Sequence, residues 1–310
     1  YKIAENVNQA ATQRGLKLGS INPNYFLKGS YRGSLSALEK ETTTQYIEQT
    51  VLAGKIAKAL GVGVVALWLP DGSNYPGQVE LRKAIDTTKR SLADISNQID
   101  RQVKVLIEYK VFEPGTYSTV LADWGSAYLM AKAFGPNAGV LVDMGHHHHT
   151  ANIEQIVARL AEDGMHGGFH FNTRYAADDD HAVEPNPEMA RIFYELLRCG
   201  VIANSQPEKN WEYMIDQCSG RENRMHAVIH SIDALHLSLA KACLVDSDAL
   251  EKHQQADDIL SANRLFNDAL INADARPIVA AARLDNNLPV DPLVAYEESG
   301  YQQKIVTDRV

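Results

Sequence analysis

The strongest constraint on this chain is a repeated alternation of short apolar runs with segments of helical periodicity. The runs are rich in Val, Ile, Leu and aromatic residues, and they occupy residues 16–22, 62–70, 103–110, 138–145, 166–172 and 210–217. Between them, apolar residues recur at helical spacing, as at Ile153, Ile156 and Leu160. Strands that alternate with helices predict a parallel sheet.

Two architectures with a parallel sheet are compatible with six predicted strands. A closed (β/α)8 barrel has eight strands, whereas a doubly wound sheet can be complete with about six. No run opens into a GxGxxG or GxxxxGK[ST] turn, so a nucleotide-binding sheet has little support. We therefore predict an α/β fold of the TIM-barrel type.

The start of the chain bears on this prediction. The first residues, "YKIAENVNQAATQRG", have a helical pattern, so we expect the first two barrel strands to lie upstream of Tyr1. A barrel that lacks two strands exposes two sheet edges and its core. We therefore expect residues 1–310 not to fold alone as an active enzyme.

The pattern changes after residue 217, where long helices are expected at 224–245 and 246–272, followed by a tail with Pro and Asp. We predict a catalytic barrel domain over 1–221, with strands three to eight, and a helical extension over 222–310. The apolar positions of the long helices exceed what one barrel face can cover, so we expect part of Arg224–Asn272 to contact a neighbouring subunit. These positions include Leu235, Leu239, Leu260, Leu265 and Leu270.

Charge and cysteine content limit the classes of partner. The net charge of −9 gives no attraction to nucleic acid or to anionic membranes. No apolar run reaches the about 18 residues that span a bilayer. The three cysteines are not arranged as CxxC, which is typical of a reducing compartment. We expect a cytoplasmic protein that binds neither nucleic acid nor membrane.

Residue types that bind metals lie near the carboxyl ends of four successive runs. They are Glu108, Asp143, His170 and Asp216, with Lys110 two residues after Glu108 and His146 three residues after Asp143. The loop that follows His170 adds Asp178, Asp179 and Asp180. In a barrel, the carboxyl ends of the strands form the active site.

Each of these residues also has a structural explanation. Glu108 and Lys110 could be an ion pair, His170 between two phenylalanines could be a core histidine, and Asp216 could cap the next segment. The acidic loop could be solvated. Taken together these explanations fail, because they require that four successive strands each place a charged or imidazole group at the same end by chance. Buried carboxylates are costly unless a cation lies among them, so the sequence predicts a metal centre.

The number of groups fits two divalent cations. One site comprises Glu108, Asp143, His170 and Asp216; a second comprises His146, Asp178 and Asp180, with Asp143 placed to bridge. Mostly carboxylate ligands favour Mn²⁺ or Mg²⁺ and suit Co²⁺, whereas Zn²⁺ would draw more on Cys and His. Within the run His146–His149, we expect His146 to be the ligand, His147 to support it, and the other two to face solvent.

Several motifs resemble a known family. The segments "IEYK", "VDMGHH", "GFHFN", the acidic loop and "MIDQ", in this order, resemble the xylose-isomerase-like barrels. With "LGSINPNYF" and "WLPDGSNYPGQ", they resemble more closely the bacterial L-rhamnose isomerases of broad specificity. The similarity extends from about residue 15 to about residue 272.

The resemblance implies a homotetrameric aldose–ketose isomerase with two Mn²⁺-type ions and a sugar substrate. L-rhamnose and L-rhamnulose are the expected pair, with D-allose and D-psicose as further substrates. By position, the set with Glu108 holds a structural ion and the set with His146 holds a catalytic ion. Trp68 matches an aromatic wall for the sugar, and Lys110 matches the cation that polarises its oxygen. The expected catalytic residues are Lys110, which stays charged, Asp216, which could carry a proton, and Asp180.

The chain departs from the family in two places. The family's ring-opening histidine lies on an early strand that this chain does not contain, and the run His147–His149 holds more histidine than the family pattern. Sequence also leaves open whether hydrogen moves as a hydride or through an enediol.

Three other functions compete with isomerisation. A sugar 3-epimerase on the same barrel uses one metal and two flanking carboxylates, which leaves the second ligand set unexplained. A multi-zinc endonuclease would need more histidine ligands and a basic groove. An inactive metal-binding assembly protein is the non-enzymatic alternative. Metal content and an assay for ketose formation from aldoses separate these possibilities.

Overall fold

The computed structural model of the chain describes residues 2–113, 116–174, 180–203, 206, 209 and 211–309. The chain divides into two compact units. Unit 1 comprises Tyr1–Ala151, Leu160–His170 and Trp211–Met214, and unit 2 comprises Asn152–Arg159, Phe171–Asn210 and Ile215–Val310. Helix α5, Ile153–Glu162, is divided between them.

The core of unit 1 is a sheet whose strands follow one another in chain order. The strands are β1 (Val64–Leu67), β3 (Lys104–Glu108), β6 (Ala138–Asp143), β7 (His166–Phe171) and β8 (Glu212–Ile215), in the order β1-β3-β6-β7-β8. The pairs from β1 to β7 are parallel. A doubly wound sheet reverses its strand order at the centre. The unbroken order is instead that of a barrel wall, which confirms the predicted TIM-barrel fold.

Five of the six predicted strands are confirmed in the described part of the chain. The exception is the run at 16–22, where only Ile21 pairs, through a single bridge to Val65. Ile21 donates its N–H to the Val64 carbonyl and accepts from the Ala66 N–H, at 3.0 and 3.1 Å. The predicted strand is therefore reduced to one residue that lies beside β1.

Side chains alternate along the strands and fill the inner face of this sheet in layers. Val64, Ala66, Leu106 and Leu141 form one buried cluster, against which Met214 packs. Gly168 of β7 belongs to the same layer, because a Cβ there would lie 2.7 Å from the Leu106 side chain and 2.9 Å from that of Leu141. The next inward position on each strand is two residues further along.

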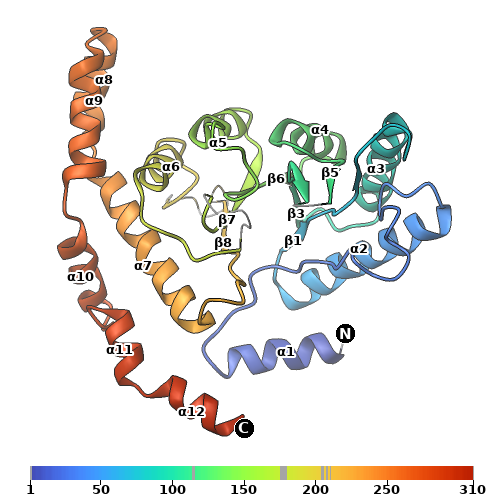
Figure 1. Cartoon of the computed structure of the whole chain (residues 1–310), viewed down its shortest axis with the longest axis horizontal. Helices are drawn as coiled ribbons and strands as arrows, with labels where there is room; N and C mark the ends of the chain where they lie inside the picture. Colours follow the sequence, from blue (N-terminus) through green and yellow to red (C-terminus); the bar gives the residue numbers. More distant parts are fainter. Residues whose placement is uncertain are drawn as a thin grey trace. The chain divides into compact units, whose positions relative to one another are not determined.

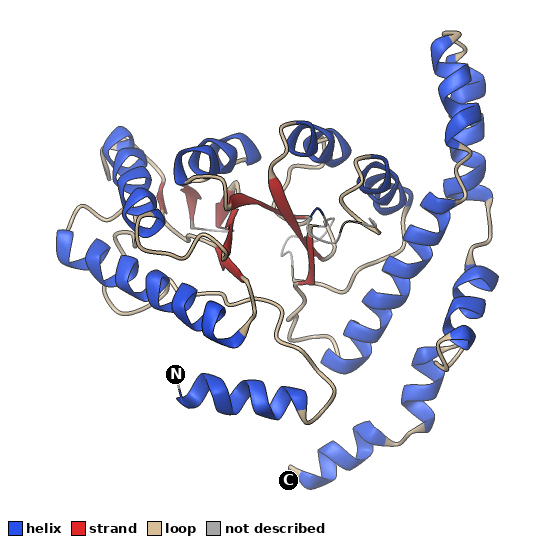
Figure 2. Cartoon of the chain, turned by 180° about the vertical axis from the view of Figure 1, so that it is seen from behind, coloured by secondary structure: helices blue, strands red, loops and turns tan. Residues whose placement is uncertain are grey.

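Helices cover the outer side of the sheet in unit 1 (Figures 1 and 2). They are α2 (Lys40–Leu60), α3 (Leu81–Ser96) and α4 (Trp124–Phe134), and α1 (Lys2–Thr12) contacts α2. Helix α4 packs on β3 and β6, and α2 packs on β1. Local sequence sets their ends: the Asp123 side chain accepts from the Ser126 N–H at the start of α4, and α2 ends at Gly61, whose φ is 65°.

A small antiparallel sheet, which the sequence analysis did not predict, joins the loops after β1 and β3. It comprises β2 (Gly72–Ser73), β5 (Tyr117–Thr119) and β4 (Phe112–Glu113), in the order β2-β5-β4. These strands are only two or three residues long, which is too short for a periodic signal. The sheet ties together the two loops that contain Trp68 and Lys110.

The described part of unit 2 is mainly helical. Its helices are α6 (Pro187–Arg198), α7 (Arg224–Cys243), α8 (Ser247–Gln255), α9 (Ile259–Asn267), the π-helix η2 (Asp268–Asn272), α10 (Arg276–Asp285), α11 (Pro292–Glu298) and α12 (Tyr301–Asp308). The long helix expected at 224–245 is present as α7. The one expected at 246–272 is wrong: Asp257 has a φ of 54°, and Asp258 then caps a new helix.

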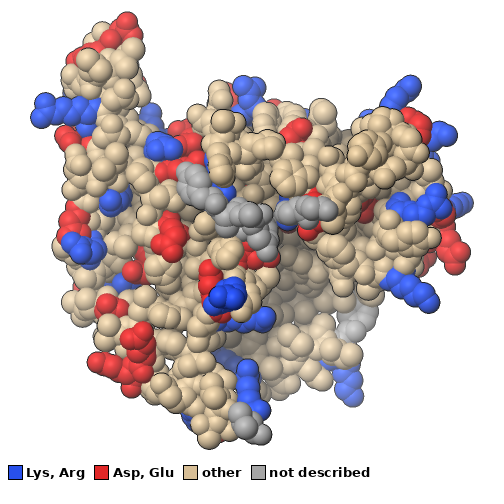
Figure 3. Space-filling model, in the orientation of Figure 1, with Lys and Arg blue, Asp and Glu red and all other residues tan. Residues whose placement is uncertain are grey.

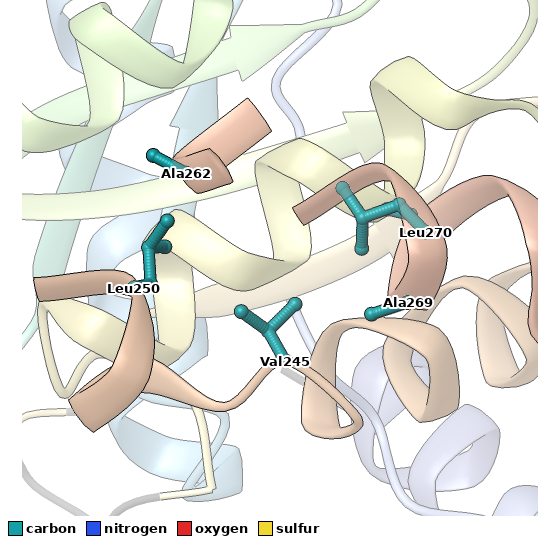
Figure 4. Close-up of a cluster of buried hydrophobic side chains, with 6 residues drawn as sticks. Val245, Leu250, Ala262, Ala269 and Leu270 are labelled. Carbon is teal, nitrogen blue, oxygen red and sulfur yellow. The ribbon is translucent and has the colours of Figure 1, made fainter. Parts of the chain in front are cut away.

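Helices α8 and α9 lie side by side (Figure 1). An apolar cluster holds this pair to the rest of unit 2 (Figure 4). Its buried members are Ala190, Val245, Leu250, Ala262, Ala269 and Leu270. Leu270, one of the positions assigned to a neighbouring subunit, is thus buried within this chain, and Leu265 packs against the same cluster. Leu260 remains 83% exposed.

Among the described residues, no single helix is long and apolar enough to cross a membrane. The helices α7 and α8 pass that test only as a pair, by length and composition, and they are bent by 57° at the break between them.

Candidate metal centre

Three metal-binding side chains meet at the carboxyl ends of adjacent strands in unit 1. Glu108 ends β3, Asp143 ends β6, and His170 is the penultimate residue of β7. Each lies two residues after a member of the inner apolar layer, which comprises Leu106, Leu141 and Gly168. Strand alternation therefore turns all three side chains to the inner face. Their ligand atoms lie within 4.8 Å of one another.

Burial and charge suit this group to the binding of a cation. The exposed fractions of Glu108, Asp143 and His170 are 4%, 0% and 5%. Nδ1 of His170 lies 3.2 Å from a Glu108 oxygen and 3.6 Å from an Asp143 oxygen. Burial alone lowers the pKa of His170, but hydrogen bonds to Asp143 and Glu108 outweigh it and raise the pKa to about 11. Two buried carboxylates thus stabilise positive charge at this position, from a proton or from a divalent cation.

His146 lies beside the same two carboxylates, whereas the sequence analysis expected it near Asp143 alone of the two. It is buried, and its Nε2 lies 3.9 Å from an Asp143 oxygen while its Nδ1 lies 3.3 Å from a Glu108 oxygen. The Gly145 N–H donates to the same Asp143 oxygen, Oδ1, at 2.8 Å. The loop after β6 therefore brings a second imidazole to the group formed by Glu108, Asp143 and His170.

Lys110 and Trp68 form one wall next to this part of the sheet. The Lys110 ammonium lies 5.7 Å from the centre of the Trp68 ring and 3.5 Å from a Glu113 oxygen. The Phe26 ring lies 5.1 Å from that of Trp68, a contact that the sequence analysis missed. The motif "NPNYF" is the only signal that would have drawn attention to it. Aromatic faces beside a cation suit a ligand with both C–H and oxygen groups.

The remaining predicted residues belong to unit 2. The Asp216 N–H donates to the Phe171 carbonyl at 3.1 Å, and Phe171 directly follows His170 in the chain. The Asp180 carbonyl accepts from the N–H groups of Cys218 and Ser219. The Asp180 side chain accepts from the Cys218 thiol at 3.1 Å, which raises the pKa of that thiol to about 11. Asp178 and Asp179 lie outside the described residues.

The histidine run divides into two pairs. His146 is buried and His147 is half-buried, whereas His148 and His149 are exposed. The Tyr109 hydroxyl lies 2.6 Å from Nε2 of His147, a partner that the sequence analysis did not assign. Burial, and then the charges of Asp143 and Glu108, raise the pKa of Tyr109 well above its ordinary value.

Comparison with known proteins places these features in a family. The model of the xylose isomerase-like TIM barrel matches residues 1–197. A probable sugar isomerase of Rhizobium meliloti is 35% identical over 306 residues, which cover 95% of this chain and 70% of that protein. A probable sugar isomerase of Mesorhizobium japonicum is 35% identical over 313 residues, which cover 98% of this chain and 72% of that protein. An L-rhamnose isomerase of Mannheimia succiniciproducens is 23% identical and is covered to 69%.

Solved structures agree on the fold. A structure of L-ribulose 3-epimerase has a TM-score of 0.55 at 15% identity, covering 83% of this chain and 82% of that one. A D-tagatose 3-epimerase-like protein has a TM-score of 0.58 at 15% identity, covering 77% and 82%. From the matching model and the relatives at 35% identity, we conclude that this chain belongs to the xylose isomerase-like TIM-barrel family.

Proposed function

We propose that this chain is a metal-dependent isomerase that interconverts an aldose and a ketose. The observation that carries the proposal is the buried group of Glu108, Asp143 and His170, whose ligand atoms converge within 4.8 Å. Oxygen-rich sites of this kind suit Mn²⁺, with Mg²⁺ and Co²⁺ as alternatives and Zn²⁺ ranked below them. The two relatives named as probable sugar isomerases support a sugar substrate.

Asp216 is our proposed fourth ligand of this first ion. It lies two residues after Met214, which packs against the inner apolar layer of the sheet. Alternation along the chain therefore assigns Asp216 to the same side as Met214. Its N–H is bonded to the residue that follows His170, which supports the assignment. We propose that His146, Asp178 and Asp180 hold a second ion, with Asp143 as the bridge.

The side chains of the wall have separate roles in this proposal. Trp68 packs against the C–H face of the sugar and excludes water from it. Lys110 stays charged and donates to the substrate oxygen, because Glu113 and the Trp68 ring both stabilise its ammonium. When bound, divalent cations stabilise negative charge that develops on the oxygens of C1 and C2. Asp216 and Asp180 are the proposed carriers of protons.

Hydrogen transfer between C1 and C2 can follow either of two routes. A hydride shift keeps the substrate hydrogen, whereas an enediol route exchanges it with solvent through a carboxylate such as Asp216. Incorporation of deuterium from D₂O into the ketose distinguishes them.

L-rhamnose and L-rhamnulose are the substrate pair that we propose, with D-allose and D-psicose as a second pair. The support is the family resemblance of "WLPDGSNYPGQ" and "GFHFN" and the relative named L-rhamnose isomerase at 23% identity. The test is a kinetic panel of L-rhamnose, L-mannose, L-lyxose, D-allose and D-ribose with added Mn²⁺. Highest kcat/KM on an aldose other than L-rhamnose would overturn the substrate assignment, but not the isomerase chemistry.

A sugar 3-epimerase is the second candidate, because several similar folds carry that name. The L-ribulose 3-epimerase and the D-tagatose 3-epimerase-like protein are each only 15% identical to this chain. The position of His146 beside Asp143 favours two ions, whereas a 3-epimerase uses one. Incubation with D-psicose separates the candidates. An isomerase releases D-allose, whereas a 3-epimerase releases the C3 epimer and no aldose.

Two further candidates have weaker support. An endonuclease would present a basic groove to its substrate. Lys and Arg side chains are interspersed with Asp and Glu on the face that Figure 3 displays, and the net charge is −9. An assembly protein without activity would bind metal but form no ketose in the panel.

We further propose a cytoplasmic homotetramer, in which residues 1–221 form the catalytic domain and residues 222–310 supply subunit contacts. Exposed apolar side chains on α9, on α10 and in the segment between α10 and α11 support the contact role. They include Ile259, Leu260, Leu284, Leu288 and Val290, each at least half exposed.

A further inference from the structure

One tyrosine contacts two successive histidines of the run. Tyr109 directly follows β3 and is 1% exposed. Its carbonyl oxygen lies 2.8 Å from Nδ1 of His146, and its hydroxyl lies 2.6 Å from Nε2 of His147. The end of β3 is thus bonded twice to the loop after β6, through a buried contact to His146 and a part-buried contact to His147.

The first contact determines which nitrogen of His146 carries the hydrogen. A backbone carbonyl can only accept, so Nδ1 of His146 is the donor. Its other neighbour, a Glu108 oxygen at 3.3 Å, is also an acceptor. In the neutral ring the lone pair therefore lies on Nε2. That nitrogen is the one 3.9 Å from the Asp143 oxygen, on the side where a second cation would lie.

The second contact holds His147 at both ring nitrogens. Nδ1 of His147 lies 3.3 Å from the Met144 carbonyl, so Nδ1 carries the hydrogen in the neutral ring. Nε2 then accepts from the Tyr109 hydroxyl. The two rings meet edge to face, with their centres 5.2 Å apart and an angle of 85° between their planes. His147 is therefore fixed between the backbone of its own loop and the end of β3.

We infer that Tyr109 and His147 form a clamp that positions His146, so that its Nε2 faces a divalent cation beside Asp143. The inference rests on the proposed role of His146 as a ligand of the second ion. Tyr109 and His147 are positioning residues in this account, because they act through His146. The clamp gives a role to the second histidine of the run, and none to His148 or His149.

The test is a Mn²⁺ titration of the whole protein, followed by electron paramagnetic resonance, with Tyr109→Phe and His147→Leu. Tyr109→Phe removes only the hydroxyl and keeps the ring. Loss of a group that orients a metal ligand weakens metal binding by about 10- to 100-fold. We expect the Kd of the second Mn²⁺ to rise by that factor in each variant, while the first Mn²⁺ binds as in the parent.

Two further readouts separate positioning from general support of the fold. At saturating Mn²⁺, kcat should return to within about two-fold of the parent with an unchanged sugar KM, because the clamp affects only occupancy. The double variant should bind the second Mn²⁺ about as weakly as the weaker single variant, because the two groups act as a unit. His149→Leu, an exposed change in the same run, is the matched control and should bind both ions normally.

Several results would overturn the clamp. Parent-like binding of the second Mn²⁺ in Tyr109→Phe would do so, as would fully additive losses in the double variant. Loss of both ions together with a lower melting temperature would show a merely structural role. His146→Ala separates a failure of the clamp from a failure of the proposed ligand role of His146. If it loses the second Mn²⁺ while Tyr109→Phe does not, only the clamp fails; if it keeps both ions, the proposed ligand role of His146 fails.

Discussion

Nδ1 of His170 lies 3.2 Å from Oε1 of Glu108, although β6 separates their strands in the sheet. Asp143, at the end of that intervening strand, also approaches the histidine. The two side chains meet because each stands one layer above the apolar interior of the sheet. The group is therefore mutually dependent, since removal of one member leaves the charge of the others buried and uncompensated.

Glu108→Ala should abolish isomerase activity and lower the free energy of unfolding by about 3–5 kcal/mol, the usual cost of breaking a buried charged group. Chemical denaturation monitored by circular dichroism measures the second effect. Asp86→Ala is the control, because Asp86 pairs with Arg90 on the exposed side of α3, where an ion pair contributes at most about 1 kcal/mol. Equal losses in the two variants would contradict the buried-charge account.

Asp143→Ala should remove both divalent cations, because Asp143 is the proposed bridge and has no solvent exposure. Metal analysis of the purified variant after dialysis against Mn²⁺ measures the stoichiometry. Two full ions per chain would show that the bridging role is wrong. Asp180→Ala should by contrast lose only the second ion, with a smaller loss of stability.

His146→Ala should lose the second ion and turnover with it. His148→Ala and His149→Ala should keep kcat within a few-fold of the parent, because both side chains are exposed. Steady-state kinetics at fixed Mn²⁺ compares the three. Similar losses at all three positions would contradict the assignment of one ligand within the run.

The stability of the metal-free protein should depend on His170. Its pKa is raised from about 6.5 to about 11, so the charged imidazole stabilises the fold. This contribution is complete below pH 6.5 and is lost as the pH rises towards 11. In the presence of a chelator, His170→Gln should lower the melting temperature most near pH 6 and progressively less towards pH 10. A difference that is constant with pH would contradict this.

The affinity for Mn²⁺ should depend on pH in the opposite direction to the stabilisation by protonated His170. The metal competes with the proton for His170, so Mn²⁺ affinity should increase with pH over the same range. Titration calorimetry at several pH values measures it.

The assembly prediction concerns the exposed apolar residues of the C-terminal segment, residues 222–310. Leu260 is 83% exposed and Leu288 is 55% exposed, although both are large and apolar. We expect light scattering to find a tetramer at micromolar concentration, and Leu260→Asp to weaken it. A stable monomer at that concentration would contradict the prediction.

Periodicity was sufficient to predict the strands that carry the site. The strands that end in Glu108 and Asp143 are buried on both faces, and this gives them nearly continuous apolar sequences. Alternation along each strand then placed the side chains of Glu108, Asp143 and His170 on one face of the sheet. The same rule did not reveal that the run at 16–22 pairs only through Ile21, because pairing depends on neighbours distant in sequence.

Other features depend on tertiary contacts that leave no periodic signal. The bond between Tyr109 and His147 joins residues 38 positions apart, and the small sheet of β2, β4 and β5 joins two loops. The break between α8 and α9 depends on the left-handed conformation of Asp257, which a hydrophobic pattern does not encode. The sequence motif "HHHH" showed that the loop after β6 is unusual, but only the structure separates the roles of its members.

The most direct test of the central claim is a crystal structure of the Mn²⁺-loaded protein with data collected at the manganese absorption edge. The account predicts two anomalous peaks per chain. One should lie among Glu108, Asp143 and His170, and the other beside Nε2 of His146, with Asp143 in contact with both. An anomalous map with no peak among Glu108, Asp143 and His170 would contradict the account.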